Sequence, residues 1–119
     1  MALKILIVDD SEFMRNLIKN IIIKEGIKGV YEAADGIEAV KKYKENKPDL
    51  VFMDIMMPNK SGLEAIKEIK NQDPTAKIII ITSLREQKAY DETENLGVNG
   101  YIVKPFIKDE IIKAIKENS

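Results

Sequence analysis

Four apolar runs in this 119-residue sequence each end at a side chain suited to chemistry. These side chains are two adjacent carboxylates, a third carboxylate, a hydroxyl and an ammonium: Asp9, Asp10, Asp54, Thr82 and Lys104. Three close carboxylates stay ionised together only where a cation joins them. Oxygen ligands without histidine or cysteine favour Mg²⁺ or Mn²⁺. If the five groups meet, they would combine a carboxylate nucleophile, a metal, a second cation and a hydrogen-bond donor, as phosphoryl transfer to oxygen requires.

Five apolar runs predict the strands that would carry these groups to one place. An unalternating apolar run between turn residues is typical of a strand buried on both faces. The predicted strands cover residues 3–8, 29–34, 50–53, 77–81 and 101–103. The second run is the least apolar, so we expect it at an edge of the sheet. In open parallel α/β sheets, ligands bind beyond the carboxyl ends of the strands, and the five groups would share that rim.

Helical periodicity and capping residues predict a helix after each strand. The predicted helices run from Asp10 or Ser11 to about 25, from 35–36 to before Pro48, from Ser61 to the turn at 73–74, from about 86 to 96, and from about 108 to 117. Asp35 with Glu38, and Ser61 with Glu64, have the spacing of capping boxes. Gly26 is expected to end the first helix.

Two of the helices differ in how much apolar surface they offer. The first is expected to pack through one apolar face: Phe13, Met14, Leu17, Ile18, Ile21 and Ile22. The fourth has only a thin stripe at positions 89, 93 and 96, which predicts weak packing and easy movement.

The alternation of strands and helices predicts a single α/β domain over residues 1–119. Short connections require parallel pairing, right-handed crossovers and helices on both faces, which makes a three-layer doubly wound sheet. The net charge of −1 gives no electrostatic reason to expect nucleic acid or an anionic membrane as a partner. The sequence has no histidine or cysteine, so it lacks imidazole and thiolate chemistry. No apolar run is long enough to span a bilayer and no segment resembles a signal peptide, so we expect a cytoplasmic protein.

The stretches around the rim resemble the receiver domain of two-component response regulators. The resemblance rests on Leu-Ile-Val-Asp9-Asp10, Met-Asp54-Ile-Met-Met-Pro58 with Gly62, Ile-Thr82-Ser and Tyr101-Ile-Val-Lys104-Pro105-Phe106, which follow the family's order and spacing along the whole chain. Phe13-Met14-Arg15 is similar to the same stretch in single-domain chemotaxis regulators. The resemblance implies a flavodoxin-like strand order, 2-1-3-4-5, and a place in archaeal or bacterial signalling.

The resemblance also implies roles for residues at the rim. Asp54 would accept a phosphoryl group, and Lys104 would contact its oxygens. Thr82 would contact them after phosphorylation. Mg²⁺ would be held by Asp9, Asp10, Asp54 and the main-chain carbonyl of Met56.

Further implied roles concern the switch and the lifetime of the phosphoryl group. Thr82 and Tyr101 would form the switch, with Tyr101 turning inward as Thr82 moves. The peptide bond before Pro105 would be cis. Met56 and Leu84 occupy positions that tune dephosphorylation, and their apolar side chains predict slow loss of the phosphoryl group.

The implied function is a signalling switch that catalyses only its own phosphorylation and dephosphorylation. Its partners would be a CheA-like histidine kinase, a downstream motor or adaptor protein, and a phosphatase. The downstream partner would read the face formed by the fourth helix, fifth strand and fifth helix. We expect a monomer that binds neither nucleic acid nor membrane.

The output of the switch is left open by one departure from the family. Ser83-Leu84-Arg85-Glu86-Gln87 stands where similar chemotaxis regulators usually carry an Ala-Met-Gly-Gln-Gln-like loop, and the fourth helix is more polar than theirs. A chemotaxis regulator is favoured, and the alternative is a phosphorelay intermediate or a phosphate sink without a motor target.

Three other classes share part of this pattern. A haloacid-dehalogenase phosphatase would carry a second aspartate where Met56 stands. In a flavodoxin, the pair Asp9-Asp10 would repel the cofactor phosphate. A pseudo-receiver is disfavoured because all five rim groups are present.

Overall fold

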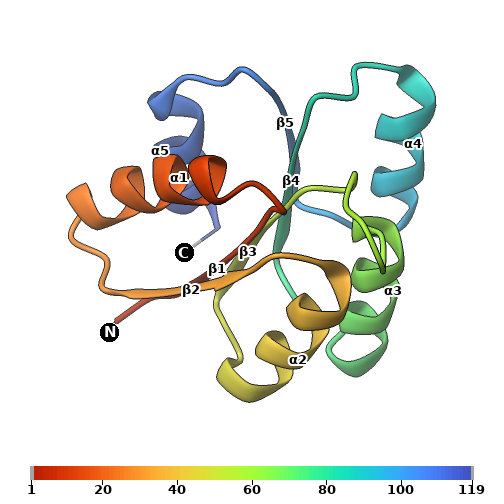
Figure 1. Ribbon diagram of the computed structural model, residues 1–119, viewed down its shortest axis with the longest axis horizontal. Coiled ribbons are helices and arrows are strands. Elements are labelled where there is room, and N and C mark those ends of the chain that lie inside the picture. Colours follow the sequence, from red (N-terminus) through yellow and green to blue (C-terminus); the bar gives the residue numbers. More distant parts are fainter. Residues whose placement is uncertain (1, 119) are drawn as a thin grey trace.

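A computed structural model describes residues 2–118 as five strands alternating with five helices (Figure 1). The elements are β1 (Lys4–Val8), α1 (Glu12–Lys24), β2 (Gly29–Ala33), α2 (Gly36–Asn46), β3 (Leu50–Met53), α3 (Gly62–Gln72), β4 (Ile78–Thr82), α4 (Gln87–Asn95), β5 (Gly100–Val103) and α5 (Lys108–Glu117). The first and last residues of the predicted domain, 1 and 119, lie outside the described part. In the described part, no helix combines the length and apolar character needed to cross a membrane.

The strands form one parallel sheet in the order β2-β1-β3-β4-β5. The predicted fold class, strand order and edge position of β2 are therefore confirmed. Val8 pairs with Met53 in the register of β1 and β3, and Met53 pairs with Ile80 of β4. Because these strands end almost level, the residues that follow them emerge at the same edge.

The sheet separates two apolar layers, which explains why its central strands are apolar without alternation. Ile5 and Ile7 of β1 pack in the layer of α1 and α5, whereas Leu6 and Val8 pack in the layer of α2 and α3. Figure 1 shows α1 and α5 on one side of the sheet and α2, α3 and α4 on the other. A strand with both faces covered needs an apolar side chain at every position.

Capping side chains begin three of the helices at the predicted residues. Ser11 Oγ accepts a hydrogen bond from the N–H of Met14, and Ser61 Oγ accepts one from Glu64. Asp35 Oδ1 accepts one from the N–H of Glu38 at 2.8 Å. These bonds satisfy N–H groups that have no partner within the helix.

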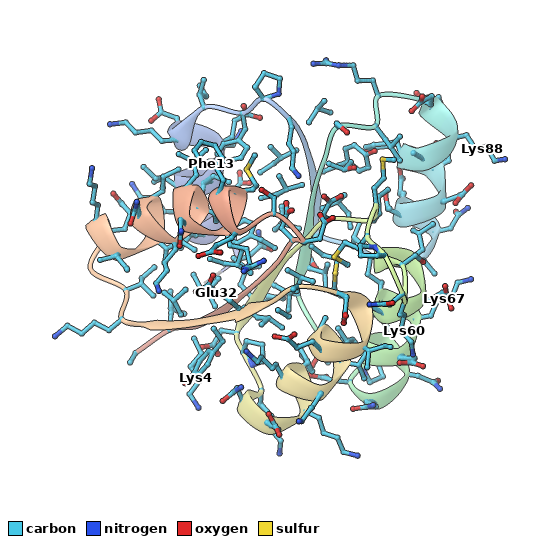
Figure 2. The ribbon with its side chains drawn as sticks, viewed as in Figure 1. Lys4, Phe13, Glu32, Lys60, Lys67 and Lys88 are labelled. Atoms are coloured by element: carbon cyan, nitrogen blue, oxygen red, sulfur yellow. The ribbon has the colours of Figure 1, made fainter. Side chains whose placement is uncertain are left out.

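The prediction that the whole apolar face of α1 is buried is wrong for the residues along one side of that face. Ile18 and Ile22 are buried, but Phe13 is 75% exposed and Leu17 is 42% exposed. Phe13 is labelled in Figure 2. At about 100° per residue, the six predicted positions span about 180° of the helix circumference. The sheet and α5 cover the part of this arc that is centred on Ile18. The part that carries Phe13 and Leu17 stays in solvent.

Helix α4 carries the thin apolar stripe that the sequence predicts. Thr93 is buried, Ala89 and Leu96 are partly buried, and Tyr90 is 44% exposed. The side chain of Thr93 donates its hydrogen bond to the carbonyl of Tyr90 inside the same helix. Few side chains therefore anchor α4 to the sheet.

Candidate functional site

Three carboxylates gather at the carboxyl edge of the sheet. Each of Asp9, Asp10 and Asp54 offers an oxygen, and these oxygens lie within 4.8 Å of one another. Asp9 and Asp54 are buried and Asp10 is exposed. The paired strands β1 and β3 bring them together, because Asp9 and Asp54 each directly follow a strand end in register with the other, and Asp10 comes next after Asp9.

Lys104 joins two of these carboxylates. Its Nζ lies 2.7 Å from Asp9 Oδ2 and 3.0 Å from Asp54 Oδ2. Lys104 comes directly after β5, two strands away from β3, and its long side chain spans the distance over β4. Burial opposes the charge on Lys104, but its hydrogen bonds to the two aspartates and their charges raise its pKa overall. The peptide bond to Pro105 is cis, in agreement with the prediction.

Asp54 carries its charge in an environment that does not favour it. Burial raises the pKa of Asp54, although the N–H of Met56 and the ammonium of Lys104 act in the opposite direction. The Met56 N–H donates to Asp54 Oδ1 at 2.9 Å, while the Met56 side chain points into solvent. An added cation would relieve this unfavourable charge.

Thr82 and Tyr101 are connected through Leu84, in the loop that follows β4. Thr82 is buried, and its Oγ1 accepts a long 3.4 Å hydrogen bond from the N–H of Leu84. The Tyr101 hydroxyl donates to the carbonyl of Leu84 at 2.8 Å, and its ring lies edge-on to Tyr90 with 5.5 Å between the centroids. Among the described residues, no hydrogen bond joins Thr82 to Asp9, Asp10 or Asp54.

The oxygen donors fit a hard divalent cation such as Mg²⁺. Two buried carboxylates and one exposed carboxylate supply charged oxygens without nitrogen or sulfur ligands. Lys104 offsets one of the three negative charges, so a cation at Asp10 would still lower the repulsion. The arrangement can hold a metal and a nucleophilic carboxylate against the same substrate atom.

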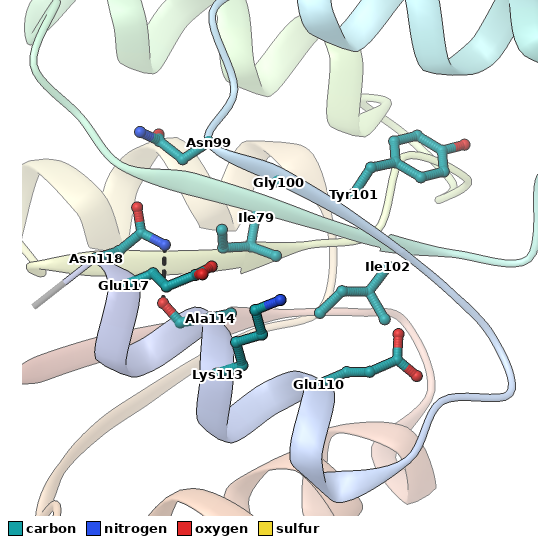
Figure 3. A pocket seen from close by; sticks show the side chains of 10 residues that line it. All are labelled: Ile79, Asn99, Gly100, Tyr101, Ile102, Glu110, Lys113, Ala114, Glu117 and Asn118. Atoms are coloured by element: carbon teal, nitrogen blue, oxygen red, sulfur yellow. Dashed lines mark hydrogen bonds between the residues drawn. The ribbon is translucent and has the colours of Figure 1, made fainter.

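Two hollows flank β5, and none of Asp9, Asp10, Asp54, Thr82 and Lys104 lines either of them. Each has a volume of about 240 Å³. Figure 3 shows the one between β5 and α5, to which α5 contributes the charged side chains of Glu110, Lys113 and Glu117. The other lies between β5 and α4 and includes Tyr90 and Glu94. Tyr101 lines both hollows, and its ring points away from the α5-side residues in Figure 3.

Sequence reasoning missed a role for Arg15. The Arg15 guanidinium donates from Nη1 to the main-chain carbonyl of Asp9 at 2.7 Å and from Nε to Glu32 Oε1 at 3.0 Å. The sequence draws attention to Arg15 only through the motif Phe13-Met14-Arg15. That motif does not reveal the bond from Arg15 to the Asp9 carbonyl.

Comparison with known proteins gives concordant matches along the chain. Residues 5–116 match the model of the response regulator receiver domain. The chain is 47% identical to the chemotaxis protein CheY of Bacillus subtilis, with 98% of each protein covered. It is also 47% identical to the CheY of Halobacterium salinarum, over 98% of this chain and 97% of that protein. The structure also resembles a chain in a CheX-CheY-BeF3-Mg+2 complex from Borrelia burgdorferi. The two align with a TM-score of 0.92 and 32% sequence identity, and the alignment covers 97% of this chain and 87% of that chain.

Proposed function

Because this chain belongs to the response regulator receiver domain family, we propose that it accepts a phosphoryl group on Asp54, with Mg²⁺, from a histidine kinase. One observation carries the proposal: Lys104 Nζ contacts both Asp9 and Asp54 beside the exposed Asp10. A carboxylate nucleophile, metal-binding oxygens and an ammonium thus meet at one point. The chain would catalyse its own phosphorylation and dephosphorylation and no other reaction.

Each side chain has a part in this transfer. A carboxylate oxygen of Asp54 would attack the phosphorus, and the bond from phosphorus to the donor nitrogen or oxygen would break. Mg²⁺, held by Asp9, Asp10, Asp54 and the Met56 carbonyl, supplies positive charge to the phosphoryl oxygens when bound. Lys104 is already within 3.0 Å of Asp54 Oδ2 and would turn to a phosphoryl oxygen. These charges stabilise the negative charge that phosphorylation adds.

The switch would run from Thr82 to Tyr101. The Thr82 hydroxyl has only a long contact to the Leu84 N–H, so turning toward a phosphoryl oxygen costs little. Residues 82–84 would move with it, and the Leu84 carbonyl holds the Tyr101 hydroxyl. Tyr101 and the weakly anchored α4 would then change the α4-β5-α5 face, as a population shift between existing states.

The output is proposed to be chemotaxis or motility control. The full-length relatives named CheY support this choice, with a CheA-like kinase, a motor or adaptor protein and a phosphatase as partners. The Borrelia burgdorferi CheY forms a complex with CheX. We propose a cytoplasmic, monomeric receiver domain over residues 1–119. The alternative is a relay intermediate or a phosphate sink, which uses the same site.

Intact-mass measurement tests the proposal directly. Incubation with acetyl phosphate and Mg²⁺ is expected to add the mass of one phosphoryl group, and chelation of the metal is expected to prevent it. A known receiver domain treated in parallel controls for the donor. If that control is labelled and this chain is not, the receiver chemistry is contradicted and a pseudo-receiver is favoured.

The apolar Met56 side chain is expected to prolong the phosphoryl lifetime. Met56 is 53% exposed next to Asp54, so Met56→Gln should keep the fold and offer an amide that orients an attacking water. We expect the phosphoryl group to be lost severalfold faster, as followed by intact mass after the donor is removed. Ile23→Gln, at a 48% exposed position near the end of α1, is the matched control. Equal lifetimes for Met56→Gln and Ile23→Gln would contradict the role of Met56.

A further inference from the structure

The Arg15 side chain is largely shielded from solvent. It is only 16% exposed, although arginine is ordinarily a surface residue. Its guanidinium lies between the carbonyl that follows β1 and Glu32 of the edge strand β2. Figure 2 shows Glu32 on β2, facing the layer of α1. The second ion pair of Glu32, to Lys19 at 3.4 Å, is longer.

Asp9 is held through each of its polar atoms. Its N–H donates to the carbonyl of Ala33, and its Oδ1 accepts a hydrogen bond from the N–H of Ser11. Its Oδ2 pairs with Lys104 and its carbonyl accepts from Arg15. Arg15 and Lys104 are thus the two side chains in the described part of the chain that hydrogen-bond to Asp9.

These two side chains differ in what they do when a substrate binds. In the proposed function, Lys104 turns partly to the phosphoryl group. Arg15 contacts the main chain and faces away from that group, toward Glu32. Of these two side chains, Arg15 is the one whose bond to Asp9 does not have to change when Lys104 turns.

We propose that Arg15 is a positioning residue for the metal site, which fixes the main chain of Asp9 by a charge-assisted hydrogen bond while Glu32 orients the guanidinium. The inference rests on the proposed function and deepens it. A planar guanidinium can make both bonds at once, and an ammonium at the same place cannot reproduce that fork. Groups behind a metal ligand typically change metal affinity by about 10-fold or more when removed.

The direction in which Mg²⁺ affinity changes when Arg15 is replaced distinguishes a positioning role from a purely electrostatic one. Arg15 carries a positive charge close to a proposed cation site, so its removal would strengthen Mg²⁺ binding if charge alone mattered. Positioning predicts the opposite result. Lys19→Gln removes the same charge from the same Glu32 without touching Asp9, which makes it the matched control.

Calorimetric titration of the full chain with Mg²⁺ tests the inference. We expect Arg15→Gln to bind Mg²⁺ about 10-fold more weakly than the wild type, and Lys19→Gln to bind as tightly or more tightly. Arg15→Lys keeps the charge and should also weaken binding. With acetyl phosphate and saturating Mg²⁺, the phosphorylation rate of Arg15→Gln should return toward that of the wild type.

The outcomes distinguish the inference from the proposed function. Equal Mg²⁺ affinity in Arg15→Gln, Arg15→Lys and Lys19→Gln would overturn the positioning role of Arg15. Tighter binding by Arg15→Gln would overturn it as well. A wild type that binds no Mg²⁺ would overturn the proposed function and, with it, the inference. Thermal unfolding of each variant identifies any loss of the fold, and Arg15→Lys provides the test if Arg15→Gln fails to fold.

Discussion

Asp54→Asn is expected to abolish the phosphoryl adduct completely. The amide has nearly the same size as the carboxylate and can still accept the hydrogen bond from the Met56 N–H, but it is a poor nucleophile. Intact mass after incubation with acetyl phosphate and Mg²⁺ measures the effect. Asp91→Asn, at an exposed position on α4, makes the same chemical change away from the site and should label like the wild type.

The stability of Asp54→Asn shows whether a missing adduct reflects lost chemistry or a lost fold. Burial raises the pKa of Asp54, so the folded state binds its proton more tightly than the unfolded state does. The resulting stability is present below the unfolded pKa and is lost as pH rises through the folded pKa. At neutral pH without metal, Asp54→Asn should therefore melt no lower than the wild type. A well-folded Asp54→Asn that still gained a phosphoryl group would rule out Asp54 as the acceptor.

Gly62→Ala is expected to have the second largest effect, because it deforms the loop that carries Asp54. A Cβ at Gly62 would lie 2.3 Å from the carbonyl oxygen of Asp54 and 2.5 Å from the Cα of Ile55. Both are main-chain atoms, so the loop or the start of α3 must move. Overpacking of this kind lowers the free energy of unfolding by about 1–3 kcal/mol. Chemical denaturation measures the loss, and the phosphorylation rate should fall with it.

A second glycine provides the control for Gly62→Ala. A Cβ at Gly100 would meet Cδ1 of Ile79 at 3.0 Å, and that side chain can shift at little cost. Gly100→Ala should therefore change the free energy of unfolding less than Gly62→Ala does. If the two substitutions have the same effect on stability and on phosphorylation, the close approach of Gly62 to the Asp54 main chain is not what positions the loop.

The local elements and the composition of the rim could be predicted from residue types and their spacing. Strand β3 is apolar at all four positions because both of its faces are covered, and Ser11, Asp35 and Ser61 begin helices because their side chains satisfy free N–H groups. Parallel pairing then requires that residues after the strands share an edge. These are short-range or topological rules, and a single sequence is enough to apply them.

The contacts within the site depended on tertiary structure. The sequence predicted Lys104 near the carboxylates, but its simultaneous contact with Asp9 and Asp54 depends on how far a side chain reaches across β4. The bond from Arg15 to the Asp9 carbonyl depends on Glu32, seventeen residues away on the edge strand. Distances of this kind arise from the twist and register of the sheet, which a pattern of residue types does not contain.

Helix α1 shows both what the sequence determines by itself and what only the tertiary structure decides. The sequence by itself determined that residues 12–24 form an amphipathic helix after the acidic pair, because helical spacing and a capping serine are properties of the local chain. Only the tertiary structure decided that Ile18 and Ile22 are buried while Phe13 and Leu17 remain in solvent. The physical reason is that burial depends on which neighbours cover a helix, and the sheet and α5 together cover a narrower arc than the apolar residues of α1 occupy.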